Sequence, residues 1–274
     1  MYNYTSAPPV GFHPDFALCV ALPLAQAAYA VMNPANPVHL PPGYEQTALI
    51  KADEPAIRAL LAQVAQDAPS PVVRALFKLS PIFGLIGKNT ATKTAFVSFR
   101  GTQTVEDWIN NFDSLAAPYR FLPDGGLAHK GFQDVYGLLR ASVMAGLSAA
   151  AQGSNRLIVT GHSLGGALAV LAAPDIAKNS GTGLAPELIT FAGPAAGLAD
   201  FAHFFDRLVP TCYRVVNFWD VVPRVPPQFP VGLFDHVGTA IHVDPGFADV
   251  VKAHSLELSY VPGLLKLLPA GFTC

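Results

Sequence analysis

The sequence is poor in charged residues and in cysteine. Asp, Glu, Lys and Arg make up only 13% of its 274 residues, and the formal net charge at pH 7 is −2. This balance gives no electrostatic basis for binding nucleic acid or an anionic membrane surface. Three cysteines are too few for a disulfide scaffold. Hydrophobic residues make up 51% of the chain, and the mean hydropathy is +0.36, which predicts a large core and some exposed apolar surface.

The N-terminal region lacks the features of a signal peptide and of a transmembrane segment. No Lys or Arg precedes Lys51, so the basic start of a secretory signal is missing. The apolar stretch 16–24 contains Pro23 and is too short to span a bilayer. We expect an amphipathic helix over Asp15–Met32, and a chain that either has no leader or has lost it. The compartment stays open.

The most informative motif is Gly161-His162-Ser163-Leu164-Gly165, which matches the pattern G-x-S-x-G. An apolar run at 157–160 precedes it and predicts a buried strand, and the Ala-rich run 166–173 predicts a helix after it. Ser163 then occupies a sharp strand-to-helix turn, where a nucleophilic serine is held with its hydroxyl above the sheet edge. The alternative is a glycine-rich turn that holds a serine by chance. We interpret Ser163 as the nucleophile of a hydrolase.

Strands and helices are expected to alternate along the chain, which predicts an α/β fold with a mainly parallel central sheet and helices on both faces. The other expected elements are a hairpin of 83–86 and 93–99 joined around Lys88-Asn89, helices over Asp53–Asp67 and Gly131–Gln152, and strands over 188–192 and 213–218. We expect one domain over residues 1–274. Working residues gather at the carboxyl ends of the strands in such sheets.

A serine nucleophile needs a histidine base and an acid that orients this base, and α/β-hydrolases carry them in the order Ser, acid, His. Asp220 ends an apolar strand and precedes the turn Val221-Val222-Pro223. We therefore prefer Asp220 as the acid over Asp175, Asp200 and Asp206.

Three histidines, His236, His242 and His254, are candidates for the base, and residue chemistry alone does not separate them. An apolar run follows His254 and favours docking of its loop on the core. Asp235, His236, His242 and Asp244 also suggest a metal site, but they lack a recognised ligand spacing. We expect no metal.

Several short motifs follow one another in a fixed order. They are Phe99-Arg100-Gly101-Thr102 with Asp107-Trp108, His129-Lys130-Gly131-Phe132, Gly161–Gly166, Phe191-Ala192-Gly193-Pro194, Asp220-Val221-Val222-Pro223 and His254…Tyr260. From about Phe83 to the C-terminus, this set resembles the class 3 lipases, the fungal-type lipase family that also contains feruloyl esterases. The resemblance implies an α/β-hydrolase fold, the triad Ser163–Asp220–His254 and no cofactor.

The resemblance also bears on the choice of base. His236 resembles an earlier, non-catalytic histidine of the family, and this is the main argument for His254. The 34 residues from Asp220 to His254 (254 − 220) are fewer than is typical of the family. Residues 68–81 have no counterpart. His129 and His162 are interpreted as histidines that pack in the core or support the catalytic residues rather than as catalysts. The alternative for Arg100 is a structural ion pair.

An oxyanion hole and a lid are further implications of the resemblance. Thr102 and Leu164 would donate the two N–H groups that stabilise the oxyanion. The lid would be the segment Thr104–Asp113, whose apolar residues form one stripe of a helix. The residues of this stripe are Val105, Trp108, Ile109 and Phe112. A helix docked permanently on the core is the alternative.

The function implied is that of a triacylglycerol lipase, which hydrolyses acylglycerol esters at an oil–water interface through an acyl-enzyme. One alternative is an esterase for short-chain, soluble or feruloyl-type esters, and another is a non-catalytic binding module on the same fold. No nucleic acid, transmembrane segment or protein partner is implied. The family suggests secretion, and the cytoplasm is the other compartment considered.

The ending Gly271-Phe272-Thr273-Cys274 resembles the tail of fungal lipases, in which the last thiol is tied to the N-terminal region. Cys19 is the only N-terminal candidate, but it lies within the predicted first helix, earlier than the family pattern places it. We therefore expect Cys19, Cys212 and Cys274 to be reduced. A Cys19–Cys274 bridge is the alternative.

Overall fold

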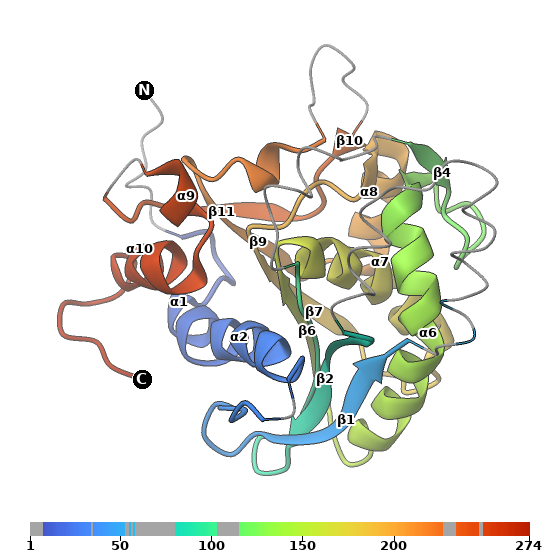
Figure 1. Cartoon of the computed structure of the whole chain (residues 1–274), viewed down its shortest axis with the longest axis horizontal. Helices are drawn as coiled ribbons and strands as arrows, with labels where there is room; N and C mark the ends of the chain where they lie inside the picture. The colour runs from blue at the N-terminus through green and yellow to red at the C-terminus, as the bar shows by residue number, and fades with distance from the viewer. Residues whose placement is uncertain are drawn as a thin grey trace.

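The computed structural model describes residues 8–33, 35–52, 55, 57, 80–102, 115–226, 234–246 and 249–274. A seven-stranded sheet runs through this described part, in the order β1-β2-β3-β6-β7-β9-β11 (Figure 1). Its strands are β1 (Glu45–Lys51), β2 (Ile82–Asn89), β3 (Thr94–Phe99), β6 (Arg156–His162), β7 (Pro186–Phe191), β9 (Cys212–Asn217) and β11 (Thr239–Val243). Strands β1, β2 and β3 pair antiparallel, and every pair from β3 to β11 is parallel. The expected mainly parallel sheet is confirmed.

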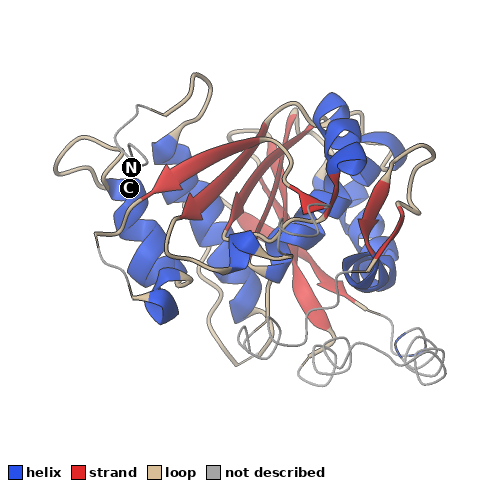
Figure 2. Ribbon diagram, turned by 90° about the horizontal axis from the view of Figure 1, so that it is seen from above, coloured by secondary structure: helices blue, strands red, loops and turns tan. Residues whose placement is uncertain are grey.

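Helices cover both faces of this sheet, as Figures 1 and 2 show. On one face, α6 (Lys130–Ala150), α7 (Leu164–Asn179) and α8 (Ala199–Leu208) share a core with β2, β3, β6 and β7. On the other face lie α2 (Leu22–Ala30) and the C-terminal helices. Because both faces are covered, all residues of β3 are buried, as are all residues of β6 except Arg156.

The hairpin, the long helix and the two later strands are found close to where the sequence predicts them. Strand β2 pairs with β3 from Gly84↔Phe99 to Asn89↔Thr94, so the turn lies just beyond the predicted Lys88-Asn89. A second, four-stranded sheet lies in the described part, in the order β10-β8-β5-β4. Its strands are β4 (Ala116–Pro118), β5 (Leu127–His129), β8 (Gly197–Leu198) and β10 (Phe234–Asp235). His129 caps α6 by accepting the Phe132 N–H.

The first helix forms, but its expected polar face does not. It consists of α1 (Pro14–Phe16), a π-helical turn η1 (Ala17–Ala21) and α2 in direct succession. None of residues 16–30 is exposed. The helix is covered by the sheet on one side and by the C-terminal segment on the other. The prediction of an amphipathic helix is therefore wrong, because a helix covered on two sides keeps no polar stripe.

The C-terminal segment contains α9 (Val250–Ala253), a π-helical turn η3 (Leu256–Tyr260) and α10 (Val261–Leu265). Helix α10 packs on η1, and a disulfide joins Cys19 to Cys274 across a Cα–Cα distance of 5.5 Å. The expectation of a reduced pair is wrong, because this packing brings the tail over the first helix. Cys212 is a buried free thiol.

Three predicted features lie outside the described residues. The first is most of the helix expected over Asp53–Asp67, of which only Pro55 and Ile57 are described, both as helical. The second is residues 68–79, and the third is the lid stripe of Val105, Trp108, Ile109 and Phe112. Among the helices that are described, none has both the length and the apolar character needed to cross a bilayer.

Candidate active site

Ser163 lies at the turn between β6 and α7, where the motif predicts it. Its φ of 60° and ψ of −132° fall in a region that residues with a side chain rarely adopt. A Cβ on Gly161 would lie 2.2 Å from the Gly165 oxygen, and a Cβ on Gly165 would lie 2.2 Å from the Phe99 oxygen. The turn can therefore close against β3 only because both positions are glycine.

Asp220 lies in the loop after β9, and its fully buried carboxylate faces His254. Nδ1 of His254 lies 2.9 Å from Oδ2 and 3.1 Å from Oδ1 of Asp220. The Val222 N–H donates to Oδ1 at 2.9 Å, and the Tyr260 hydroxyl donates to Oδ2 at 2.7 Å. A carboxylate accepts, so Nδ1 carries the proton and Nε2 is left as the basic nitrogen of His254.

Two buried side-chain polar atoms of the described residues lack a hydrogen-bond partner there, and these are Oγ of Ser163 and Nε2 of His254. A serine Oγ and a histidine Nε2 are the atoms that a serine hydrolase uses as nucleophile and base. Burial of polar atoms without partners is rare and needs an explanation. These two atoms are therefore the candidates for the chemistry of the site.

The turn that carries Thr102 lies against the nucleophile. A Cβ on Gly101 would lie 2.8 Å from the Cβ of Ser163, and Thr102 is buried directly after it. Leu164 is the first residue of α7, and its N–H belongs to the first helical turn, where the helix dipole favours negative charge. Leu164 therefore follows Ser163 in the chain, and Thr102 follows a residue that packs against Ser163.

Arg100 holds this turn through backbone atoms. Its buried guanidinium donates to the carbonyl oxygens of Ile82, Ser80 and Gly101 and stacks over the ring of Phe83. Burial lowers the pKa of Arg100 to about 10. In the described part of the chain, Arg100 thus binds backbone oxygens instead of forming the structural ion pair that was the alternative interpretation of this residue.

The other two candidate histidines lie elsewhere. His236 donates from Nε2 to the Pro223 oxygen at 2.7 Å, and burial together with the Arg214 charge lowers its pKa to about 4. His242 lies in β11, and burial and Arg214 lower its pKa too. His254 is the histidine that contacts Asp220.

The three rejected acids have structural partners. Asp175, buried in α7, accepts hydrogen bonds from Tyr136, Arg140 and Asn179. Asp200 accepts the N–H of Leu127, and Asp206 accepts the N–H of Gly238. No group of three or more His, Cys, Asp and Glu side chains in the described residues is arranged to hold a metal ion.

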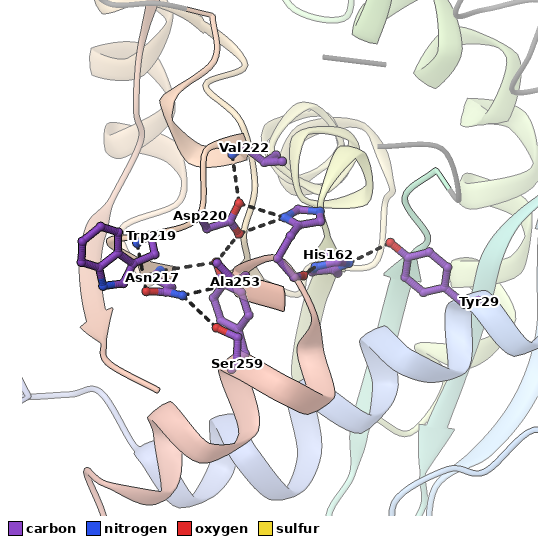
Figure 3. A network of polar contacts seen from close by, with 10 residues as sticks. Tyr29, His162, Asn217, Trp219, Asp220, Val222, Ala253 and Ser259 are labelled. Carbon is purple, nitrogen blue, oxygen red and sulfur yellow. Dashed lines mark hydrogen bonds and ion pairs between the residues drawn. The ribbon is translucent and has the colours of Figure 1, made fainter. Parts of the chain in front are cut away.

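Sequence reasoning assigned no role to Tyr29 or Tyr260, and it interpreted His162 as a histidine that packs in the core or supports the catalytic residues. Figure 3 shows Tyr29 and His162 pointing toward one another, and the Tyr29 hydroxyl lies 2.8 Å from Nδ1 of His162. Nε2 of His162 lies 2.9 Å from the backbone oxygen of His254. Asn217 supports the same region by donating to Ser259 and to the Ala253 oxygen. No local pattern signals these contacts, since Tyr29 is 133 residues from His162.

Solved structures identify the class of fold. Lipase LIP2 of Yarrowia lipolytica superposes with a TM-score of 0.61 at 21% identity, over 82% of this chain and 78% of that one, which bears on the fold alone. The lipase–propeptide complex of Rhizomucor miehei superposes with a TM-score of 0.54 at 30% identity, over 58% of this chain and 50% of that one. The chain has the α/β-hydrolase fold of these lipases.

Sequence comparison then identifies the family. Residues 96–229 match the family model described as "Lipase (class 3)", and this region of the chain belongs to that family. Secreted mono- and diacylglycerol lipase 1 of Fusarium solani is 32% identical over 190 residues, which are 69% of this chain and 55% of the relative. A lipase of Rhizomucor miehei is 33% identical over 149 residues, 52% of this chain and 40% of the relative. The chain thus spans about half the length of these curated relatives.

Proposed function

We propose that this protein is a carboxylic ester hydrolase that cleaves acylglycerols, with Ser163 as nucleophile, His254 as base and Asp220 as the acid that orients His254. The observation that carries the proposal is the 2.9 Å contact of the His254 Nδ1 with the Asp220 carboxylate, together with the strained backbone at Ser163. The names of the relatives support it, since both the Fusarium and the Rhizomucor proteins are lipases.

The proposed reaction is acyl transfer through a covalent intermediate. Oγ of Ser163 attacks the ester carbonyl while Nε2 of His254 takes the serine proton. The C–O bond to the leaving group then breaks as His254 donates this proton to the departing oxygen, which leaves as the alcohol. The N–H groups of Thr102 and Leu164 stabilise the negative oxygen that forms in between. Water then attacks the acyl-enzyme by the same route and releases the carboxylic acid. Asp220 stabilises the imidazolium in both halves of the reaction.

An exposed apolar surface beside Asp220 favours a water-insoluble substrate. Phe218, Trp219 and Val221 are 38%, 42% and 39% exposed, and they flank the candidate acid in the chain. The rings of Phe218 and Trp219 contact one another edge to face with centroids 5.2 Å apart. Adjacent exposed aromatic side chains are typical of surfaces that meet lipid or another apolar partner.

A substrate profile tests the proposal. The wild-type protein is assayed on p-nitrophenyl esters of increasing chain length and on emulsified mono-, di- and triacylglycerols, with matched alanine variants of three residues. We expect Ser163→Ala and His254→Ala to lose activity by several orders of magnitude, because triad members act as a unit, while His236→Ala keeps it.

Full activity in Ser163→Ala overturns the hydrolase proposal. Loss in His236→Ala with retention in His254→Ala overturns the assignment of the base. Activity confined to dissolved short-chain esters identifies an esterase instead.

A further inference from the structure

A chain of hydrogen bonds connects helix α2 to the backbone of His254 (Figure 3). A carbonyl oxygen only accepts, so Nε2 of His162, 2.9 Å from the His254 oxygen, must carry a proton. Nδ1 of a neutral His162 is then an acceptor, and the Tyr29 hydroxyl donates to it at 2.8 Å. The direction of each bond is fixed by the chemistry of its two atoms.

These hydrogen bonds require a neutral His162 and a protonated Tyr29 hydroxyl, and the surroundings of both residues favour these states. Burial, together with the nearby His254, holds the pKa of His162 well below its ordinary value, which keeps the ring neutral. Burial raises the pKa of Tyr29, which keeps its hydroxyl protonated. A neutral His162 also matters because its ring centroid lies only 4.5 Å from that of His254. A charge on His162 would oppose the positive charge that His254 gains during the proposed reaction.

Tyr29 also lies against a second chain segment. A Cβ on Gly101 would lie 2.4 Å from the Tyr29 oxygen, so the hydroxyl packs directly on this glycine. The Tyr29 hydroxyl therefore contacts the turn that leads to Thr102. It also contacts His162, which precedes Ser163 in the chain, and His162 in turn contacts the backbone of His254. These are three of the chain segments that form the candidate site, and the loop that carries Asp220 is another.

We propose that Tyr29 and His162 are positioning residues: the Tyr29 hydroxyl fixes the tautomer of His162, whose Nε2–H holds the backbone of His254 so that its imidazole stays against Asp220. This inference rests on the proposed function and adds to it two residues that touch neither the ester nor the transferred proton.

The first test is kinetic and uses single-group changes. Tyr29→Phe removes one hydroxyl, His162→Leu removes both ring nitrogens, and His162→Gln restores a neutral donor and acceptor. Tyr44→Phe is the matched control, since Tyr44 is another tyrosine on the same face of the sheet and packs on Phe96. Each variant is assayed for kcat and KM on dissolved p-nitrophenyl butyrate and for the rate at which a fluorophosphonate labels Ser163.

We expect Tyr29→Phe to lower kcat on the order of 10-fold and His162→Leu on the order of 100-fold with little change in KM, because a misplaced base slows chemistry more than binding. Labelling of Ser163 slows in parallel, His162→Gln recovers part of the loss, and Tyr44→Phe keeps the wild-type kcat. A wild-type kcat and labelling rate in Tyr29→Phe overturns the inference, as does an equal loss in Tyr44→Phe.

A second measurement needs no variant to fold. Nitrogen-15 histidine spectra of the wild-type protein at pH 7 should show His162 protonated at Nε2 and unprotonated at Nδ1, and the opposite tautomer overturns the inference. A wild-type protein that neither hydrolyses esters nor is labelled at Ser163 is a different result, because it overturns the proposed function itself.

Discussion

The hydroxyl of Tyr260 donates to Oδ2 of Asp220 at 2.7 Å, and the same oxygen lies 2.9 Å from Nδ1 of His254. Asp220 is thereby held by a side chain from the segment that also carries the histidine. Since Tyr260 lies six residues after His254, any movement of this segment displaces the base and the support of the acid together.

The first prediction concerns this contact. Tyr260→Phe should lower kcat roughly 10-fold, because a freer carboxylate orients His254 less well, while Asp220→Asn should lower it by about four orders of magnitude. Both are measured on a dissolved ester. Tyr119→Phe is the control, since the Tyr119 hydroxyl donates to the Leu171 oxygen in the core. If Tyr119→Phe reduces kcat as much as Tyr260→Phe does, the effect is one of stability and the prediction is wrong.

The second prediction concerns pH and His236. Its pKa in the folded protein is about 4, below the value of about 6.5 in an unfolded chain. The unfolded chain therefore binds a proton that the folded protein does not as the pH falls from about 7 toward 4, so stability is lost on acidification. His236→Gln should reduce the loss of unfolding free energy between pH 7 and pH 5 by about 1–2 kcal/mol. Urea unfolding at both pH values measures this, with the exposed His39→Gln as control. An unchanged pH dependence in His236→Gln contradicts the prediction.

The third prediction concerns the disulfide. Breaking the Cys19–Cys274 bond by Cys19→Ser should lower the free energy of unfolding by about 2–4 kcal/mol, because the unfolded chain regains freedom. Thermal unfolding with and without reductant measures it. Reductant should destabilise the wild-type protein and leave Cys19→Ser unchanged. Titration of three thiols in the unfolded, unreduced wild-type protein would show that the bond does not form.

The fourth prediction concerns the lid, which lies outside the described residues. If Thr104–Asp113 is a helix that buries its apolar stripe when closed and meets lipid when open, activity on a short-chain triacylglycerol rises faster than linearly above the solubility limit. Trp108→Ser should blunt this rise more than it lowers activity on dissolved ester. Simple saturation without a break at the solubility limit favours a soluble-ester esterase.

The sequence predicts best those features whose cause is local. The turn at Ser163 follows from two glycines and two flanking apolar runs, and the position of Asp220 follows from the strand that ends before it. His254 depended on the resemblance to a family, because the segment around it contains only short elements.

Features that depend on packing between distant segments were not predictable in this way. Tyr29 contacts His162 only because α2 lies across β6, which no periodicity in either segment encodes. The same holds for the bond between Cys19 and Cys274. The missing polar face of the first helix has a related cause, since the sequence does not show that the C-terminal segment covers it.

The packing of the chain's two ends on one another has a consequence for how the protein opens. Leu256 and Tyr260 share a hydrophobic cluster with Phe12 and Leu18, whereas α6 and α7 belong to another. Segments of one protein open with different free energies, and those near the chain ends are often the first to open. An opening of the segment that carries Leu256 and Tyr260 would move His254 away from Ser163 while the centre of the sheet stays folded. Amide hydrogens of residues 256–265 should then exchange faster than those of β6, at temperatures where hydrolysis has stopped but the core is still folded.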